Sequence, residues 1–177
     1  SDFNWLKRHI PKGAHAVATD VTSGLATIGI MGPRARDLLS CLTKDDLSNK
    51  AFPFGSSREI ELGYALVRAS RITYVGELGW ELYIPTEFTL GVYDLLVEAG
   101  AEYHLRHIGM HAMNSLRIEE AYRHYGHDIT DNDTPLQAGL GFAVAFDKPN
   151  GFIGREALLK HKENGVNKPF VQFLLEN

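Results

Sequence analysis

One glutamate in the chain stands where two glycines shape the backbone around it. Glu77 lies between Gly76 and Gly79 in the stretch Tyr-Val-Gly-Glu-Leu-Gly, with strand-favouring residues on both sides. Glycines at such positions let the chain turn tightly and let a ligand approach the backbone. A carboxylate held on this turn can accept two parallel hydrogen bonds from a flat donor edge, such as a guanidinium group or the 2-amino and N3–H edge of a pterin. The alternative is an ordinary β-hairpin whose turn glutamate faces water.

Two more residues could serve the same ligand. Arg117 stands in a segment that we predict to be an inward-facing helix, and a buried arginine needs a partner because an unpaired buried charge is costly. It either reaches a ligand or pairs with a nearby acid as part of the architecture; the candidate acids are Glu119, Glu120 and Glu77. Tyr74 either packs against or hydrogen-bonds the ligand, or it fills the core with its hydroxyl satisfied.

The segment 122–128 is rich in titratable side chains but does not predict a metal site. His124, His127 and Asp128 do not form the firm three- or four-ligand pattern that zinc requires. We expect Asp128 to hydrogen-bond local backbone N–H groups instead. The pair Gly139 and Gly141 lacks the third glycine of a dinucleotide-binding fingerprint, so we predict no flavin or nicotinamide site in this chain.

The bulk composition excludes several classes of protein. The chain has 177 residues, a formal charge of −4 and a pI near 6.0, which argues against a nucleic-acid surface. No apolar run approaches the length that crosses a membrane, and we expect no signal peptide. The single cysteine, Cys41, excludes an intrachain disulfide, and its apolar neighbours predict a buried, inert thiol in a reducing compartment.

The hydrophobic pattern predicts an α+β fold with antiparallel sheets and flanking helices. We expect helices at 4–10, with Trp5, Leu6 and Ile10 on its inner side, and at 33–43, 85–100, 110–123 and 154–161. We expect strands at 16–21, 25–30, 58–62, 64–75, 80–84, 142–146 and 170–175.

Four blocks, in order along the chain, resemble the aminomethyltransferase (glycine cleavage T-protein) family. The first block is the Tyr-x-Gly-Glu-x-Gly stretch that carries Glu77, and the second is Ser-Leu-Arg-Ile-Glu at 115–119. The others are Tyr-Gly-His-Asp-Ile at 125–129 and Thr-Pro-Leu at 134–136 followed by Gly139. The local sequences at 75–83, 52–55 and 141–149 are more similar to the T-protein-like portion of dimethylglycine and sarcosine dehydrogenases. In those proteins this portion follows a flavin-binding oxidase domain.

The resemblance implies a module that binds tetrahydrofolate and accepts a one-carbon unit, with FAD in an upstream domain not present here. Glu77, Arg117 and Tyr74 are the residues that it places against the folate. It also implies that residues 1–165 are the later part of the folate-binding module and that 166–177 are the first strand of a truncated C-terminal barrel. The piece alone is expected to be inactive, and no catalytic acid or base is named, because the family's functional aspartate belongs to the earlier half of the module.

The remaining expectations concern the whole protein. Its small-molecule partners would be a folate and a methylated amine, with no nucleic acid, membrane or metal, and the piece alone could form a homodimer. The location would be cytoplasmic in a bacterium and the mitochondrial matrix in a eukaryote. Two other functions stay open: a stand-alone aminomethyltransferase or folate-dependent demethylase, and a non-catalytic homologue such as a pyruvate dehydrogenase phosphatase regulatory subunit.

Overall fold

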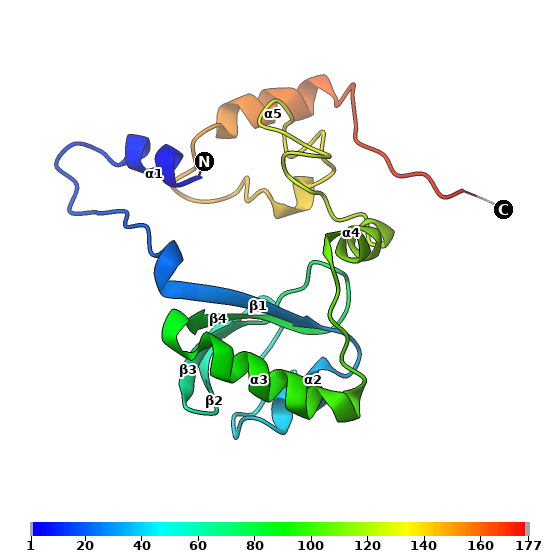
Figure 1. Cartoon of the computed structure of the whole chain (residues 1–177). Helices are drawn as coiled ribbons and strands as arrows, with labels where there is room; N and C mark the ends of the chain where they lie inside the picture. Colours follow the sequence, from blue (N-terminus) through cyan, green and yellow to red (C-terminus); the bar gives the residue numbers. More distant parts are fainter. Residues whose placement is uncertain (1, 176–177) are drawn as a thin grey trace. The chain divides into compact units, whose positions relative to one another are not determined.

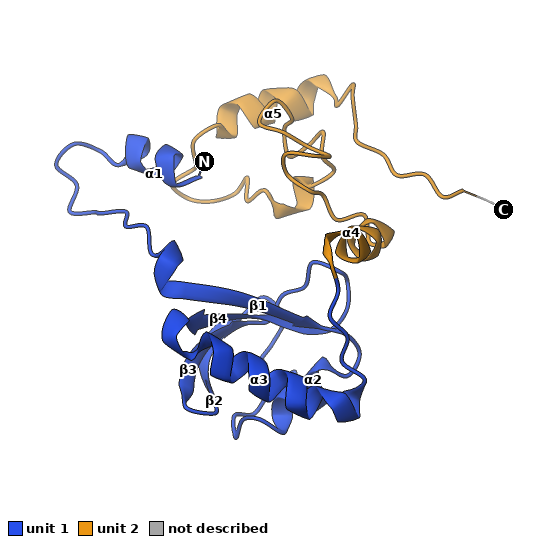
Figure 2. Cartoon of the chain, viewed as in Figure 1, with its two compact units in different colours: residues 1–108 blue, residues 109–177 orange. Residues whose placement is uncertain are grey.

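The computed structural model of the protein describes residues 2–175. The chain divides into two compact units, residues 1–108 and 109–177, which are coloured separately in Figure 2. The first unit holds a β-sheet with helices, and the second holds helices and turns. The predicted α+β class with an antiparallel sheet is confirmed.

The first unit is built on a four-stranded antiparallel sheet with the strand order β1-β4-β3-β2 (Figure 1). The strands are β1 (Leu25–Met31), β2 (Ser57–Leu62), β3 (Ala65–Ser70) and β4 (Gly79–Pro85). A tight turn joins β2 to β3, and the longer connection 71–78 joins β3 to β4. The register pairs Met31 with Gly79, which fixes where this connection leaves the sheet.

One face of this sheet forms the apolar core of the unit. Alternate residues of β3 and β4 are buried, including Val67, Trp80 and Leu82 at 0 % exposure, as the period of two in a strand requires. Helices α2 (Ala35–Ser40) and α3 (Thr89–Gly100) cover this face and contact β4 (Figure 1). Fully burying a large apolar side chain contributes about 1.5–3 kcal/mol, so this face stabilises the unit.

The first unit also holds α1 (Asp2–His9) and short 3₁₀ helices at Thr22–Gly24, Thr86–Phe88 and Ala101–Tyr103. The predicted inner face of α1 is wrong, because the helix has no buried residue and Trp5 is 48 % exposed. The predicted strand at 16–21 is also absent from the structure. The helix predicted at 33–43 is shorter, because residues 33–34 form a turn before α2 begins. Cys41 is exposed rather than buried, and its thiol donates to the Leu38 carbonyl (2.9 Å).

The second unit contains α4 (Met110–Glu119), a 3₁₀ helix at Gly141–Ala143 and α5 (Arg155–Asn164). Of its described residues only Ala138 and Arg117 are buried, so a charged side chain stands where an apolar core would be expected. The predicted strand at 142–146 is wrong: no strand of the sheet lies in the described part of this unit, and Phe142 is 89 % exposed. An apolar run becomes a strand only where a neighbouring strand completes its hydrogen bonds.

The C-terminal segment of the second unit contacts the rest of the unit near Phe170 and forms no strand. The expectation of a strand at 170–175 is therefore wrong, and residues 176–177 lie outside the described part. The backbone N–H of Phe170 donates to the Gln137 carbonyl (2.7 Å), and the Arg123 guanidinium lies 5.3 Å from the Phe170 ring centre. The division into a module at 1–165 and a barrel strand at 166–177 stays a prediction.

Candidate functional site

Glu77 lies on the connection between β3 and β4, and its side chain is exposed. Gly76 precedes it with φ +80°, in the left-handed region that favours glycine. Glu77 makes no hydrogen bond or ion pair with any other residue in the part of the chain that the structure describes. Both carboxylate oxygens are therefore open to a partner from outside the chain.

The backbone around Glu77 is anchored on both sides. Val75 is buried, and its N–H donates to the Thr73 hydroxyl (3.2 Å). The Leu78 carbonyl accepts from the Gly32 N–H (2.8 Å), which ties the end of the loop to the residue after β1. The loop thus presents an exposed carboxylate on a fixed backbone, which fits both readings of Glu77: a turn glutamate that faces water and an acceptor for a planar pair of donors.

Gly79 brings this loop close to β1. A Cβ atom at Gly79 would lie 2.5 Å from the Met31 Cγ and 2.8 Å from the Ile30 carbonyl oxygen. Such contacts are sterically forbidden, so only glycine allows this approach of the two strands. The packing of β1 against β4 therefore requires glycine at position 79, independently of any ligand of Glu77.

Tyr74 belongs to the same loop as Glu77. Its side chain is half-buried and interacts with neighbouring groups. This environment is compatible with both readings of the residue, core packing and contact with a ligand, so its role in binding stays a prediction.

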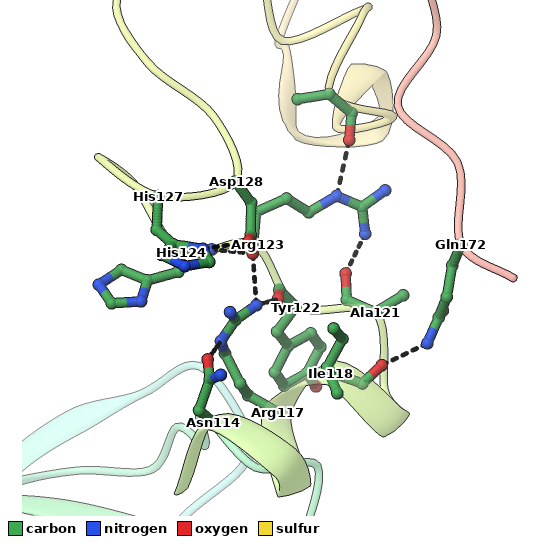
Figure 3. Close-up of polar contacts among 11 residues, drawn as sticks. Asn114, Arg117, Ile118, Ala121, Tyr122, Arg123, His124, His127, Asp128 and Gln172 are labelled. Atoms are coloured by element: carbon green, nitrogen blue, oxygen red, sulfur yellow. Dashed lines mark hydrogen bonds and ion pairs between the residues drawn. The ribbon is translucent and has the colours of Figure 1, made fainter. Parts of the chain in front are cut away.

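Arg117 lies on α4 in the second unit and is 1 % exposed. Figure 3 shows its guanidinium group surrounded by acceptors from its own helix and from the turn that follows. Its Nε donates to the Asn114 Oδ1 (2.8 Å), and its Nη1 donates to the Tyr122 carbonyl (2.6 Å) and to the Asp128 Oδ2 (2.5 Å). The architectural partner is thus Asp128, and not Glu119, Glu120 or Glu77.

Asp128 is the centre of this polar network (Figure 3). The His124 N–H donates to its Oδ2 (2.9 Å), and His127 Nδ1 lies 2.8 Å from its Oδ1. The expectation that Asp128 binds local backbone N–H groups is confirmed. Burial raises the pKa of this carboxyl, but the hydrogen bonds from His127, His124 and Arg117 and the charge of Arg117 outweigh it and lower the pKa to about 2. Asp128 is therefore ionised at neutral pH, as a buried guanidinium requires.

A pocket of about 300 Å³ adjoins this network within the second unit. Asp128 and Asp133 line one part of it, and the segment 168–171 lines another. Within residues 2–175 no three His, Cys, Asp or Glu side chains converge as a metal site would require. The helices described at 2–175 include none with the length and hydropathy to cross a membrane.

The two groups of predicted site residues fall in different units. Glu77 and Tyr74 share one loop of the first unit, whereas Arg117 is held in the second. The sequence did not reveal that Asp128, eleven positions after Arg117, supplies the ion-pair partner. The sequence shows Asp128 only as the single acid of the Tyr-Gly-His-Asp-Ile block. Its pairing with Arg117 becomes visible in the folded structure.

Comparison with known proteins gives a consistent result along the chain. The family model described as the GCVT N-terminal domain matches residues 1–148. A 4-methylaminobutanoate oxidase (formaldehyde-forming) of Paenarthrobacter nicotinovorans is 45 % identical over 98 % of this chain and 21 % of its own length. The human mitochondrial dimethylglycine dehydrogenase is 38 % identical over 96 % of this chain and 20 % of its own length.

Shorter and non-dehydrogenase proteins are similar as well. An aminomethyltransferase of Caldanaerobacter subterraneus is 38 % identical over 97 % of this chain and 45 % of its own length. A mouse pyruvate dehydrogenase phosphatase regulatory subunit also matches. The chain thus spans about a fifth of the long relatives and less than half of the short one.

Proposed function

This chain belongs to the GCVT N-terminal domain family, and from that premise we propose that it forms part of a tetrahydrofolate-binding, one-carbon-accepting module. In the whole protein, the module would work beside an FAD-containing domain that oxidises an N-methyl amine such as dimethylglycine or sarcosine. The similarity to dehydrogenases and an oxidase over nearly the whole chain supports this choice. The amine, the FAD domain and the activity of the longer protein are part of the proposal.

The observation that carries the proposal is the unpaired carboxylate of Glu77 on its anchored loop. A pterin offers a planar donor pair, its 2-amino group and N3–H, and a carboxylate offers a planar acceptor pair at matching spacing. The donor and acceptor sets therefore fit. Arg117 fits less well as a direct ligand, since Asn114, Tyr122 and Asp128 already accept from its guanidinium.

When bound, a reduced folate supplies the nitrogen that takes up the one-carbon unit, and the chain supplies position. Glu77 would fix the rotation of the pterin by a pair of charge-assisted hydrogen bonds. Tyr74, on the same loop, would limit the access of water to one side of the ring. Arg117 and Asp128 would hold α4 and the following turn in one arrangement, because each needs the other as a partner.

Isothermal titration calorimetry with tetrahydrofolate tests the proposal on the intact protein. We expect Glu77→Gln, which keeps the shape but loses the charge, to weaken binding more than about tenfold, or about 1.4 kcal/mol. The matched control is Glu87→Gln, because Glu87 is an exposed glutamate of the same unit in the 3₁₀ helix before α3. Equal affinity of wild type and Glu77→Gln would remove Glu77 from the folate site, and no folate binding at all would overturn the module's proposed function.

A regulatory role without catalysis is the second candidate, favoured by the similarity to the phosphatase regulatory subunit. The reduction of bound flavin on addition of dimethylglycine or sarcosine separates the two, because a regulator would bind its cofactors without turning over. A stand-alone aminomethyltransferase would lack the flavin domain. The location, cytoplasmic or in the mitochondrial matrix, and the pairing of two copies of this chain stay predictions.

A further inference from the structure

Three arginines of the first unit, Arg36, Arg58 and Arg71, gather around one buried aromatic pair. We call them the arginine cluster. The guanidinium carbons of Arg36 and Arg71 lie 5.8 and 5.7 Å from the centre of the Trp80 ring. The guanidinium carbon of Arg58 lies 4.4 Å from the centre of the Phe52 ring, and the two aromatic rings are 6.1 Å apart. Arginines from α2, β2 and the β3–β4 connection thus lie against the same pair of aromatic rings.

Uncharged acceptors hold the cluster in place. Arg36 Nε donates to the Leu47 carbonyl (3.0 Å), and its Nη2 donates to the Asn49 side chain (2.6 Å). Arg71 Nη1 donates to the Phe52 carbonyl (2.6 Å). Arg58 donates to the carbonyls of Asp46 and Ala51. These bonds fix the guanidinium planes, but a carbonyl dipole does not neutralise a full charge.

Within residues 2–175, no Asp or Glu oxygen lies within ion-pair distance, 4.0 Å, of the three guanidinium groups. By contrast, Arg34, Arg68, Arg117 and Arg155 each have such a partner.

The charges of Arg36 and Arg71 are close enough to repel each other. Burial, and then the charge of Arg36, lower the pKa of Arg71. The Nε of Arg58 is buried and has no hydrogen-bond partner. The charge of Arg58 acts only weakly on the Asp46 carboxyl: hydrogen bonds from Ser48 are the main cause of the lowered pKa of Asp46, and the charges of Arg58 and Lys50 contribute least.

We propose that the arginine cluster is a binding site for a small dianion that presents several carboxylate or phosphoryl oxygens. Rigid planar forks with open charge are suited to such groups, and arginine gives up its hydration more readily than lysine. The site goes beyond the folate proposal and does not depend on Glu77. Bound oxygens would supply the negative charge that the described residues lack.

NMR of the arginine Nε–Hε groups of this chain, during titration with inorganic phosphate at constant ionic strength, tests the site. We expect the Hε signals of the cluster to move and saturate, and Arg36→Gln and Arg71→Gln to weaken binding at least about tenfold each. Arg68→Gln is the matched control, because Arg68 is exposed and its partner is Glu59. A parallel titration with glutarate identifies the source of the oxygens: saturation by phosphate alone assigns phosphoryl groups, and saturation by glutarate alone assigns carboxylates.

Shifts that grow linearly without saturation with both anions would overturn the site, because the cluster would then only hold the loop. Equal affinity in wild type, Arg36→Gln and Arg71→Gln would overturn it too. If circular dichroism shows that Arg71→Gln is unfolded, Arg71→Lys replaces it. That variant keeps the charge and loses the planar fork, so we expect weaker binding, and unchanged binding would contradict the proposal.

Discussion

Replacing Asp128 by asparagine should destabilise the second unit, because it breaks the buried ion pair with Arg117. Arg117 is 1 % exposed, and its Nη1 lies 2.5 Å from the Asp128 carboxylate. The amide keeps one acceptor oxygen but removes the charge that balances the guanidinium. Removing one partner of a buried pair costs about 3–5 kcal/mol.

The titration of Asp128 gives a second figure, for all the contacts of its carboxylate together. The folded pKa of about 2 against an ordinary value of 3.8 corresponds to about 2 kcal/mol of stability at neutral pH. The lower figure applies, because Asp128 is 12 % exposed and asparagine retains part of the hydrogen bonding. Because the folded pKa is the lower one, the stabilisation is present above pH 3.8 and is lost as the pH falls from 3.8 towards 2.

Hydrogen exchange followed by mass spectrometry measures the effect in the unit concerned. We expect peptides from α4 and residues 121–139 of Asp128→Asn to lose about thirtyfold in protection at pH 7, the factor that about 2 kcal/mol represents. The control is Asp147→Asn, because Asp147 is exposed. Equal protection in Asp128→Asn and wild type would refute the argument that this pair organises the unit.

Two further predictions concern the first unit. Trp80→Ala should lower the free energy of unfolding by about 3–5 kcal/mol in urea denaturation, because Trp80 is fully buried on β4, an inner strand of the sheet. A loss below about 1 kcal/mol, or one equal to that of exposed Trp5→Ala, would contradict the placement of the core. Gly79→Ala should lower the melting temperature clearly more than Gly29→Ala, because a Cβ at Gly79 meets the Ile30 carbonyl at 2.8 Å, whereas at Gly29 its nearest neighbour is the Met31 Cε at 3.6 Å; equal melting temperatures would speak against the close approach of β1 and β4.

Most of the sheet of the first unit could be predicted from the sequence, because the hydrophobic pattern of a strand is local. Strands β1, β2 and β4 alternate or carry runs of strand-favouring residues bounded by turns, and their predicted ranges agree with the structure within two residues. The strand predicted at 64–75 ends at Ser70, where the regular register with β2 stops. The Arg71 N–H still donates to the Ser56 carbonyl (2.9 Å), but the Arg71 carbonyl accepts from the Gly55 N–H (2.9 Å), one residue out of register. A periodic pattern does not reveal where a neighbouring strand stops.

The second unit could be predicted less well, because polar contacts rather than an apolar core organise it. The apolar run 142–146 has the composition of a buried strand, but no strand pairs with it in the described part of the unit. Arg117 could be recognised as a residue that needs a partner, but the choice of Asp128 depends on a turn that only the fold defines. The arginine cluster has no sequence signature, since its members come from three separate elements.

The structure of the intact protein with a reduced folate bound is the most direct test of the account. We predict both Glu77 carboxylate oxygens within about 2.7–3.2 Å of the 2-amino and N3 nitrogens of the pterin. A pterin bound elsewhere, with the Glu77 side chain left in water, would contradict it.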